Sequence, residues 1–228
     1  MTSLTFLVAK RGARTAAAAL LVVVALSACG RVDTGAGEAA RVGADQLRTA
    51  AVLDQTSVVV ALGQETGVPV ADPADINRAQ VSAWIEGELT AGVAKKLDVT
   101  VSEGDVDRFL ARVSGQNGVT REVFEGQIAV QPGSWVTPER LEAFTRTFLE
   151  QQAIAEKLAP KGTAEQRNAA LERAIGVEAE AQGVTVSPRF GSWDAAEVKI
   201  SGSPDDLSSP PRLKEPEITS QPTLPQQG

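Results

Sequence analysis

The sequence predicts a mainly α-helical domain, built of several helices, with a small two-stranded sheet that joins its N- and C-terminal ends. Between residues 45 and 183, apolar residues recur at helical spacing in successive segments. Most of these segments begin with an N-capping residue, and Gly or Pro separates them. Two short runs, 39–43 and 184–186, are instead predicted to be strands.

The first 28 residues have the features of a secretory signal peptide. Lys10, Arg11 and Arg14 form a positive region, and residues 16–26 follow as an unbroken apolar run. That run is shorter than the ~20 residues that a transmembrane helix needs. Its length and flanks fit the apolar region of a signal peptide, so we expect residues 1–28 to be removed.

The apolar run ends in Leu26-Ser27-Ala28-Cys29, which is similar to the lipobox of bacterial lipoproteins. The resemblance implies that Cys29 becomes a diacylglyceryl cysteine, carries fatty acids such as palmitate and is the first residue after cleavage. Cys29 is the only cysteine, so it has no disulfide partner within the chain. The alternative is an ordinary secretory signal followed by a chance cysteine. With two or three acyl chains, the protein would be anchored to the outer face of the cytoplasmic membrane.

The composition restricts the chemistry that the chain can perform. It contains no His and no Tyr, and its single Cys is assigned to lipidation. Nucleophilic triads with His and zinc sites with His or Cys are therefore excluded. We expect no metal, no cofactor and no enzymatic activity. A hydrolase that uses carboxylates such as Glu122 or Glu125 remains an alternative, but no residue spacing supports it.

Charge argues against some partners. The formal net charge of the whole chain is -7, and it becomes -10 without residues 1–28, which contain three basic and no acidic residues. Nucleic acids are bound by clustered Lys and Arg, so a nucleic-acid partner is not expected. Attachment to the membrane is expected through the lipid alone.

The mature chain begins with a Gly-rich tether, residues 29–38, followed by the first strand. A helix is predicted from an N-cap at Asp45 to about Glu65, and the next helix begins at Asp72-Pro73 and continues to about Leu97. The later predicted helices share a Ser or Thr N-cap, at Ser102, Thr120, Thr137 and Thr163.

The helical domain is predicted to span residues 39–200. Residues 201–228 are rich in Pro, Ser and Gln and are expected to be a disordered tail.

The last strand leads into a closing motif, Val-x-Val-x-Pro-Arg-Phe-Gly-x-Trp, over residues 184–193. With the order of the predicted elements, this motif resembles the SurA/PrsA-type chaperone family, and in particular actinobacterial lipoproteins with a SurA-like N-terminal domain. The residues of the motif that follow the strand are Pro188, Arg189, Phe190, Gly191 and Trp193. They are interpreted as a packing motif, with direct client contact as the alternative.

The resemblance implies that the first strand pairs with residues 184–186. Many members of the family also carry a parvulin-type prolyl isomerase domain ahead of the last helix. Here that junction is only residues 159–162, and parvulin sites rely on His, so isomerase activity is not expected. What the family then implies is chaperone-like binding of unfolded secreted polypeptides. The alternative is a structural or adaptor lipoprotein that docks one partner of the cell envelope.

Aromatic side chains are the candidates for client binding. They form either an apolar groove for extended segments or the core of the domain, and they are Trp84, Phe109, Phe124, Trp135, Phe144 and Phe148. Trp135 follows Pro-Gly-Ser in a loop and is expected to be the most exposed of them. Trp135 and Phe124 are therefore the predicted client-binding residues.

Overall fold

The structure is a computed structural model that describes residues 37–131, 135–195 and 197–202. The predicted signal peptide, Cys29, most of the predicted tether and nearly all of the Pro-rich segment 201–228 lie outside the described residues. The expectations for those segments therefore stay predictions.

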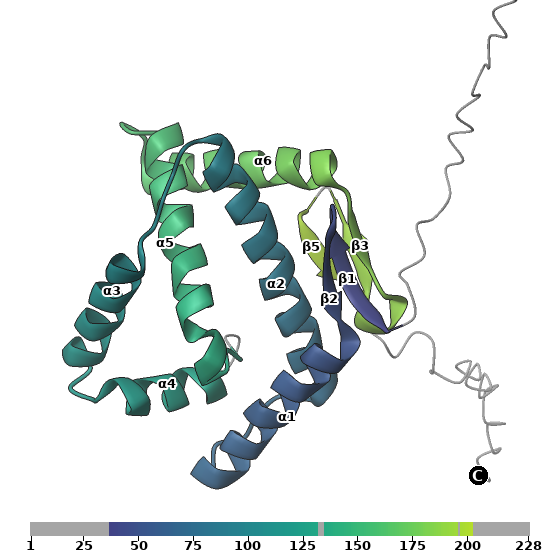
Figure 1. The fold of residues 1–228 in the computed structure, drawn as a ribbon, viewed down its shortest axis with the longest axis vertical. Coiled ribbons are helices and arrows are strands. Elements are labelled where there is room, and N and C mark those ends of the chain that lie inside the picture. Colours follow the sequence, from purple (N-terminus) through teal and green to yellow (C-terminus); the bar gives the residue numbers. More distant parts are fainter. Residues whose placement is uncertain (1–36, 132–134, 196, 203–228) are drawn as a thin grey trace, which may run out of the picture. The chain divides into compact units, whose positions relative to one another are not determined.

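The described chain is mainly helical, as predicted (Figure 1). Its helices are α1 (Thr49–Thr66), α2 (Pro73–Lys96), α3 (Glu103–Gln116), α4 (Arg121–Val130), α5 (Leu141–Leu158) and α6 (Ala164–Gln182). Its strands are β1 (Glu38–Val42), β2 (Asp45–Arg48), β3 (Val184–Val186), β4 (Ser192–Asp194) and β5 (Lys199–Ser201). Two short 3-10 helices, η1 (Pro138–Arg140) and η2 (Pro188–Phe190), complete the fold.

Most of the predicted helix starts are confirmed by their capping hydrogen bonds. Asp72, Ser102, Thr120 and Thr163 each accept a bond from a backbone N–H in the first turn, and α3 and α6 begin with complete capping boxes. Thr137 differs, because its side chain makes no capping bond. The segment that begins there is η1, and α5 starts at Leu141.

The two ends of the domain pair as predicted. β1 is antiparallel to β3, with Ala40 opposite Val186 and Val42 opposite Val184. The sheet has a third strand, since the order is β2-β1-β3 and β1 is central (Figure 1). β4 and β5 form a separate two-stranded sheet.

The predicted N-cap at Asp45 is wrong. Asp45 is the first residue of β2 and lies opposite Val42, across a turn at Gly43 and Ala44. Gly43 has a φ of 57°, a left-handed conformation that glycine adopts at little cost. After this turn the chain runs back along β1 as β2, and Leu47 of β2 is buried. Because β2 occupies residues up to Arg48, α1 begins only at Thr49.

The largest cluster of buried apolar side chains surrounds β1. Val81, Ile85 and Leu89 of α2 pack there with Ile175 and Ala179 of α6 and with residues of β1 and the closing segment. A smaller cluster joins α3 to the start of α5 and contains Val101, Val106, Leu110, Val136 and Leu141. None of the described helices is both long and apolar enough to cross a membrane.

Candidate functional site: an apolar groove between α2 and α5

Trp135 is buried, contrary to the prediction. Its side chain is only 6% exposed and packs with Val59 and Ile76, in the space between α1 and α2. Its backbone has a φ of 47°, and its carbonyl oxygen accepts a hydrogen bond from the Gln80 side chain. The sequence placed Trp135 in an exposed loop, but contacts with two distant helices decide its burial.

Phe124 is half-buried on α4 and packs against the small cluster of α3 and α5. It does not line the groove described below, and neither does Trp135. The two aromatic residues that the sequence singled out for client binding therefore both pack against apolar clusters of the domain.

The aromatic side chains that reach the surface are instead on α5. Phe144 is 42% exposed and Phe148 is 39% exposed, and they are the most exposed aromatic residues in the described part of the chain. They lie one helical turn apart, so both are on the same face of α5. With half-buried Trp84 of α2, they line a cavity of about 410 Å³, which we call the α2–α5 groove.

Phe148 is held in position from the side of α3. Its ring lies 5.5 Å from that of Phe109, centroid to centroid, and the two planes are tilted by 52°. Such a tilted pair is a favourable arrangement of aromatic rings. The Arg112 guanidinium carbon lies 5.2 Å from the centroid of the Phe109 ring, in a cation–π contact. Contacts with Phe109 of α3, which itself contacts Arg112, therefore hold Phe148 in the wall of the groove.

The groove also has charged side chains at its edge. Burial raises the pKa of the Glu88 carboxyl, Asp45 raises it further and Arg140 opposes the shift. Burial likewise raises the pKa of Glu150. These carboxylates are partly desolvated beside an apolar surface, which is the environment that raises carboxyl pKa values.

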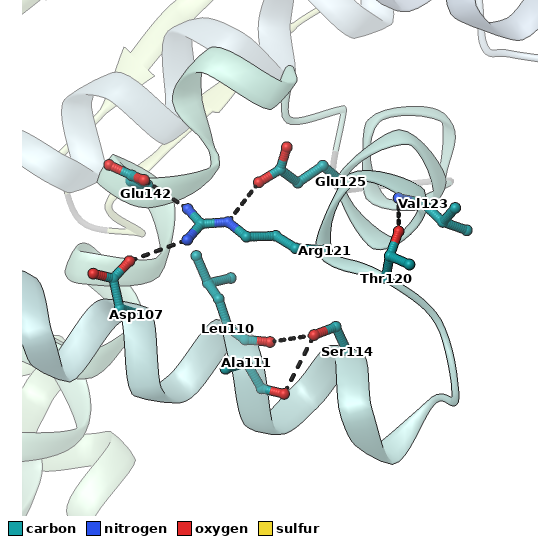
Figure 2. A network of polar contacts seen from close by, with 9 residues as sticks. All are labelled: Asp107, Leu110, Ala111, Ser114, Thr120, Arg121, Val123, Glu125 and Glu142. Atoms are coloured by element: carbon teal, nitrogen blue, oxygen red, sulfur yellow. Dashed lines mark hydrogen bonds and ion pairs between the residues drawn. The ribbon is translucent and has the colours of Figure 1, made fainter.

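A network centred on Arg121 fixes the helices that position α5 (Figure 2). Arg121, the first residue of α4, donates to Glu125 Oε1 at 2.8 Å, to Asp107 Oδ1 of α3 at 3.0 Å and to Glu142 Oε1 of α5 at 2.6 Å. Bonds to Glu125, then to Asp107, raise the pKa of Arg121, so this guanidinium stays charged. Three helices therefore share one cation.

The carboxylates considered for hydrolysis do not have the properties of a general acid. Glu125 is bound to Arg121. Glu122 is exposed, and hydrogen bonds at the start of α4, from its own backbone N–H and from Thr120, lower its pKa. A general acid near neutral pH needs a raised pKa instead.

The closing motif packs against the main core. Phe190 is buried there, and the Arg189 guanidinium lies over its ring, 5.4 Å from the centroid. Gly191 has a φ of 121°, and a Cβ atom at that position would lie 2.7 Å from Ile200 Cγ2 and 2.8 Å from the Ser201 carbonyl oxygen. Only glycine fits that close approach of two backbones. Trp193 is half-buried in β4, opposite Ile200 of β5.

Comparisons with protein-family models, with curated proteins and with solved structures found no match to this chain. Its activity therefore has to be inferred from its own residues. Across the ranges that the structure describes, no three His, Cys, Asp or Glu side chains come together in a group that could hold a metal ion. The α2–α5 groove is the feature to which a binding function can be attached.

Proposed function

We propose that this protein is a lipid-anchored folding helper outside the cytoplasm, which binds apolar segments of unfolded secreted polypeptides and has no isomerase activity. The observation that carries the proposal is the pair of exposed aromatic residues, Phe144 and Phe148, beside Trp84 in the α2–α5 groove. The lipid anchor at Cys29 would keep this groove next to the membrane that secreted chains cross.

Partly exposed aromatic rings between two helices suit transient binding. An extended peptide can lay alternate side chains on such a surface, and each ring brings a large apolar area. Phe144 and Phe148 are already more than half covered, so a client can remove only their remaining apolar area from water. At ~25 cal/mol per Å², that area gives each ring a modest contribution. Weak individual contacts allow a client to be released once it folds.

The connection between α5 and α6 supports the absence of an isomerase domain. α5 ends at Leu158 and α6 begins at Ala164. Arg167 of α6 donates hydrogen bonds to the carbonyl oxygens of Ala159 and Pro160, which fixes this short turn. The chain therefore passes directly from one helix to the next at the position where many SurA/PrsA-type chaperones insert their catalytic domain.

An aggregation assay tests the proposal. All described helices and strands lie between Glu38 and Ser201, so the chain from Gly30 to Gly228 keeps their contacts without the lipid. At several-fold molar excess, this form is expected to reduce light scattering by a reduced, unfolded secreted protein. The double variant Phe144→Ser with Phe148→Ser is expected to lose most of that effect.

The matched control replaces two exposed apolar side chains outside the groove, Leu53 of α1 and Val123 of α4, by Ser. This variant should suppress aggregation as well as the unmodified chain does. Equal suppression by the phenylalanine variant, or no suppression by the unmodified chain, would contradict the proposal. A pull-down that yields a single stoichiometric partner, without a broad set of clients, would favour the adaptor function instead.

A further inference from the structure

A second cavity, of about 840 Å³, lies between α2, α6 and the β4–β5 hairpin, and we call it the Trp193 cavity. Buried side chains of Ile85, Leu89 and Ile175 form part of its lining, and so does the half-buried indole of Trp193. The inner part of the cavity is therefore apolar, and Trp193 forms one of its walls.

The Trp193 cavity adjoins the α2–α5 groove. Glu86 of α2 and Gln151 of α5 line both of them. The Gln151 side-chain amide donates to Glu86 Oε1 at 2.7 Å, so these two residues form the boundary between the hollows. A polypeptide segment lying in the groove can extend a neighbouring side chain into the cavity.

The rim of the Trp193 cavity carries net negative charge, because its lining contains four Glu against one Arg and one Lys. Glu86, Glu172 and Glu180 line it and are exposed, and within the described ranges no Lys or Arg forms an ion pair with any of them. The two cations of the lining have partners of their own, although Arg173, bonded to a neutral carbonyl, keeps its charge at the rim. Lys199 is paired with Glu197, and Arg173 Nε donates to the carbonyl oxygen of Ala169 at 3.0 Å.

Gly176 opens the rim between two of these glutamates. Residues 172, 176 and 180 follow each other at i+4 spacing on α6, so Gly176 lies between Glu172 and Glu180 on one face. A Cβ atom at Gly176 would meet only Val198 Cγ2, at an ordinary 3.7 Å. Packing therefore does not require the glycine, which is a poorer helix former than Ala. Its effect is to leave the space between the glutamates free.

We propose that the Trp193 cavity binds a Lys or Arg side chain of the client segment whose apolar side chains lie on Trp84, Phe144 and Phe148. The charge and shape of the lining identify this occupant. The carboxylates of the rim attract the cationic group, the indole face offers a cation–π contact, and the apolar lining covers the methylene chain. The preferred client is thus an apolar segment that contains a basic residue, and this inference rests on the proposed function.

Peptide binding to the chain from Gly30 to Gly228 tests the inference by fluorescence anisotropy. The probe is a short fluorescein-labelled peptide of Leu, Phe and Ser with one Lys, and its control has uncharged norleucine in place of the Lys. The Lys peptide is expected to bind about fivefold more tightly, the size typical of charge contacts near solvent. Added salt should reduce this preference because it screens exposed charges.

Two matched pairs of variants locate the preference. Glu172→Gln with Glu180→Gln should abolish it, whereas Asp54→Asn with Glu65→Gln, the same change of charge on α1, should leave it intact. Gly176→Leu places a bulky side chain between the two glutamates and should weaken binding of the Lys peptide, while Gly176→Ala should not.

Equal affinity for the two peptides, or a preference that survives the Glu172 and Glu180 substitutions, would overturn the inference. If the two peptides bind equally well but the Phe144 and Phe148 variant binds neither, the proposed function stands without this preference for basic residues. If neither peptide binds and aggregation is not suppressed, the proposed function fails, and this inference fails with it.

Discussion

Two regions of the domain are stabilised in different ways. The strand-centred region, formed by β1, β3, α2 and α6, contains the largest set of buried apolar side chains. The α3–α4 region, formed by α3, α4 and the start of α5, has a small apolar cluster and the exposed ion pairs of Arg121. Short amphipathic helices bury few side chains, so electrostatic contacts contribute a larger share of the stability there.

A core truncation in each region gives the largest expected effect. Leu89 and Leu110 are both completely buried, Leu89 in the strand-centred region and Leu110 in the α3–α4 region. Replacement by Ala should cost about 2–5 kcal/mol of unfolding free energy, with Leu89→Ala at the upper end because Leu89 belongs to the larger of the two buried clusters. Urea unfolding measures both values. A larger loss for Leu110→Ala would break the comparison.

Removal of the central cation of the α3–α4 region should have an intermediate effect. Arg121→Met loses three ion pairs and is expected to cost about 1 kcal/mol, since exposed pairs contribute little individually. The loss should shrink in 1 M salt, where the Debye length is about 3 Å. Arg108→Met, which removes one exposed pair with Asp105, is the control and should cost less. A loss at Arg121 that does not depend on salt would mean that packing, and not charge, joins these helices.

The smallest expected effect, of opposite sign, comes from removing the charge of the Glu150 carboxyl on α5. Burial raises its pKa in the folded state above the unfolded value, so the folded state holds its proton to higher pH. Stability is then lost as pH rises from the unfolded pKa through the folded one. Glu150→Gln should therefore stabilise the protein at pH 7 by a few tenths of a kcal/mol, within the range of surface substitutions.

The same substitution should have no such benefit below pH 4, where Glu150 is protonated in both states. Thermal unfolding at the two pH values measures the difference. A stabilisation that is equal at both would show that ionisation is not its cause.

The fold was predictable wherever the signal is local. Ser102 and Thr163 cap helices through bonds to residues three positions further on, so their sequence context contains the whole motif. Asp45 was misread because an acidic residue after glycine fits both an N-cap and a hairpin. Pairing of Asp45 with Val42, in a strand already paired with β3, decided between them.

The candidate site was predictable in kind but not in place. Phe144 and Phe148 were among the aromatic residues proposed for a groove, and they lie on a face of α5 that no other element covers fully. Trp135, expected to be the most exposed of the set, instead packs between α1 and α2. The Trp193 cavity was not foreseen at all. Its walls bring α2 together with α6 and β4–β5, which lie far from α2 in the chain.

The sequence by itself determined the helical class, most of the capped helix starts and the absence of His-based chemistry, because these depend on local patterns or on composition. The pairing of the two ends joins segments far apart in the chain, and it was expected only from the family resemblance. Only the tertiary structure decided which aromatic residues are exposed and that glutamates of α2 and α6 converge around Trp193. Burial and charge density depend on which surfaces meet, and contacts between distant segments settle that.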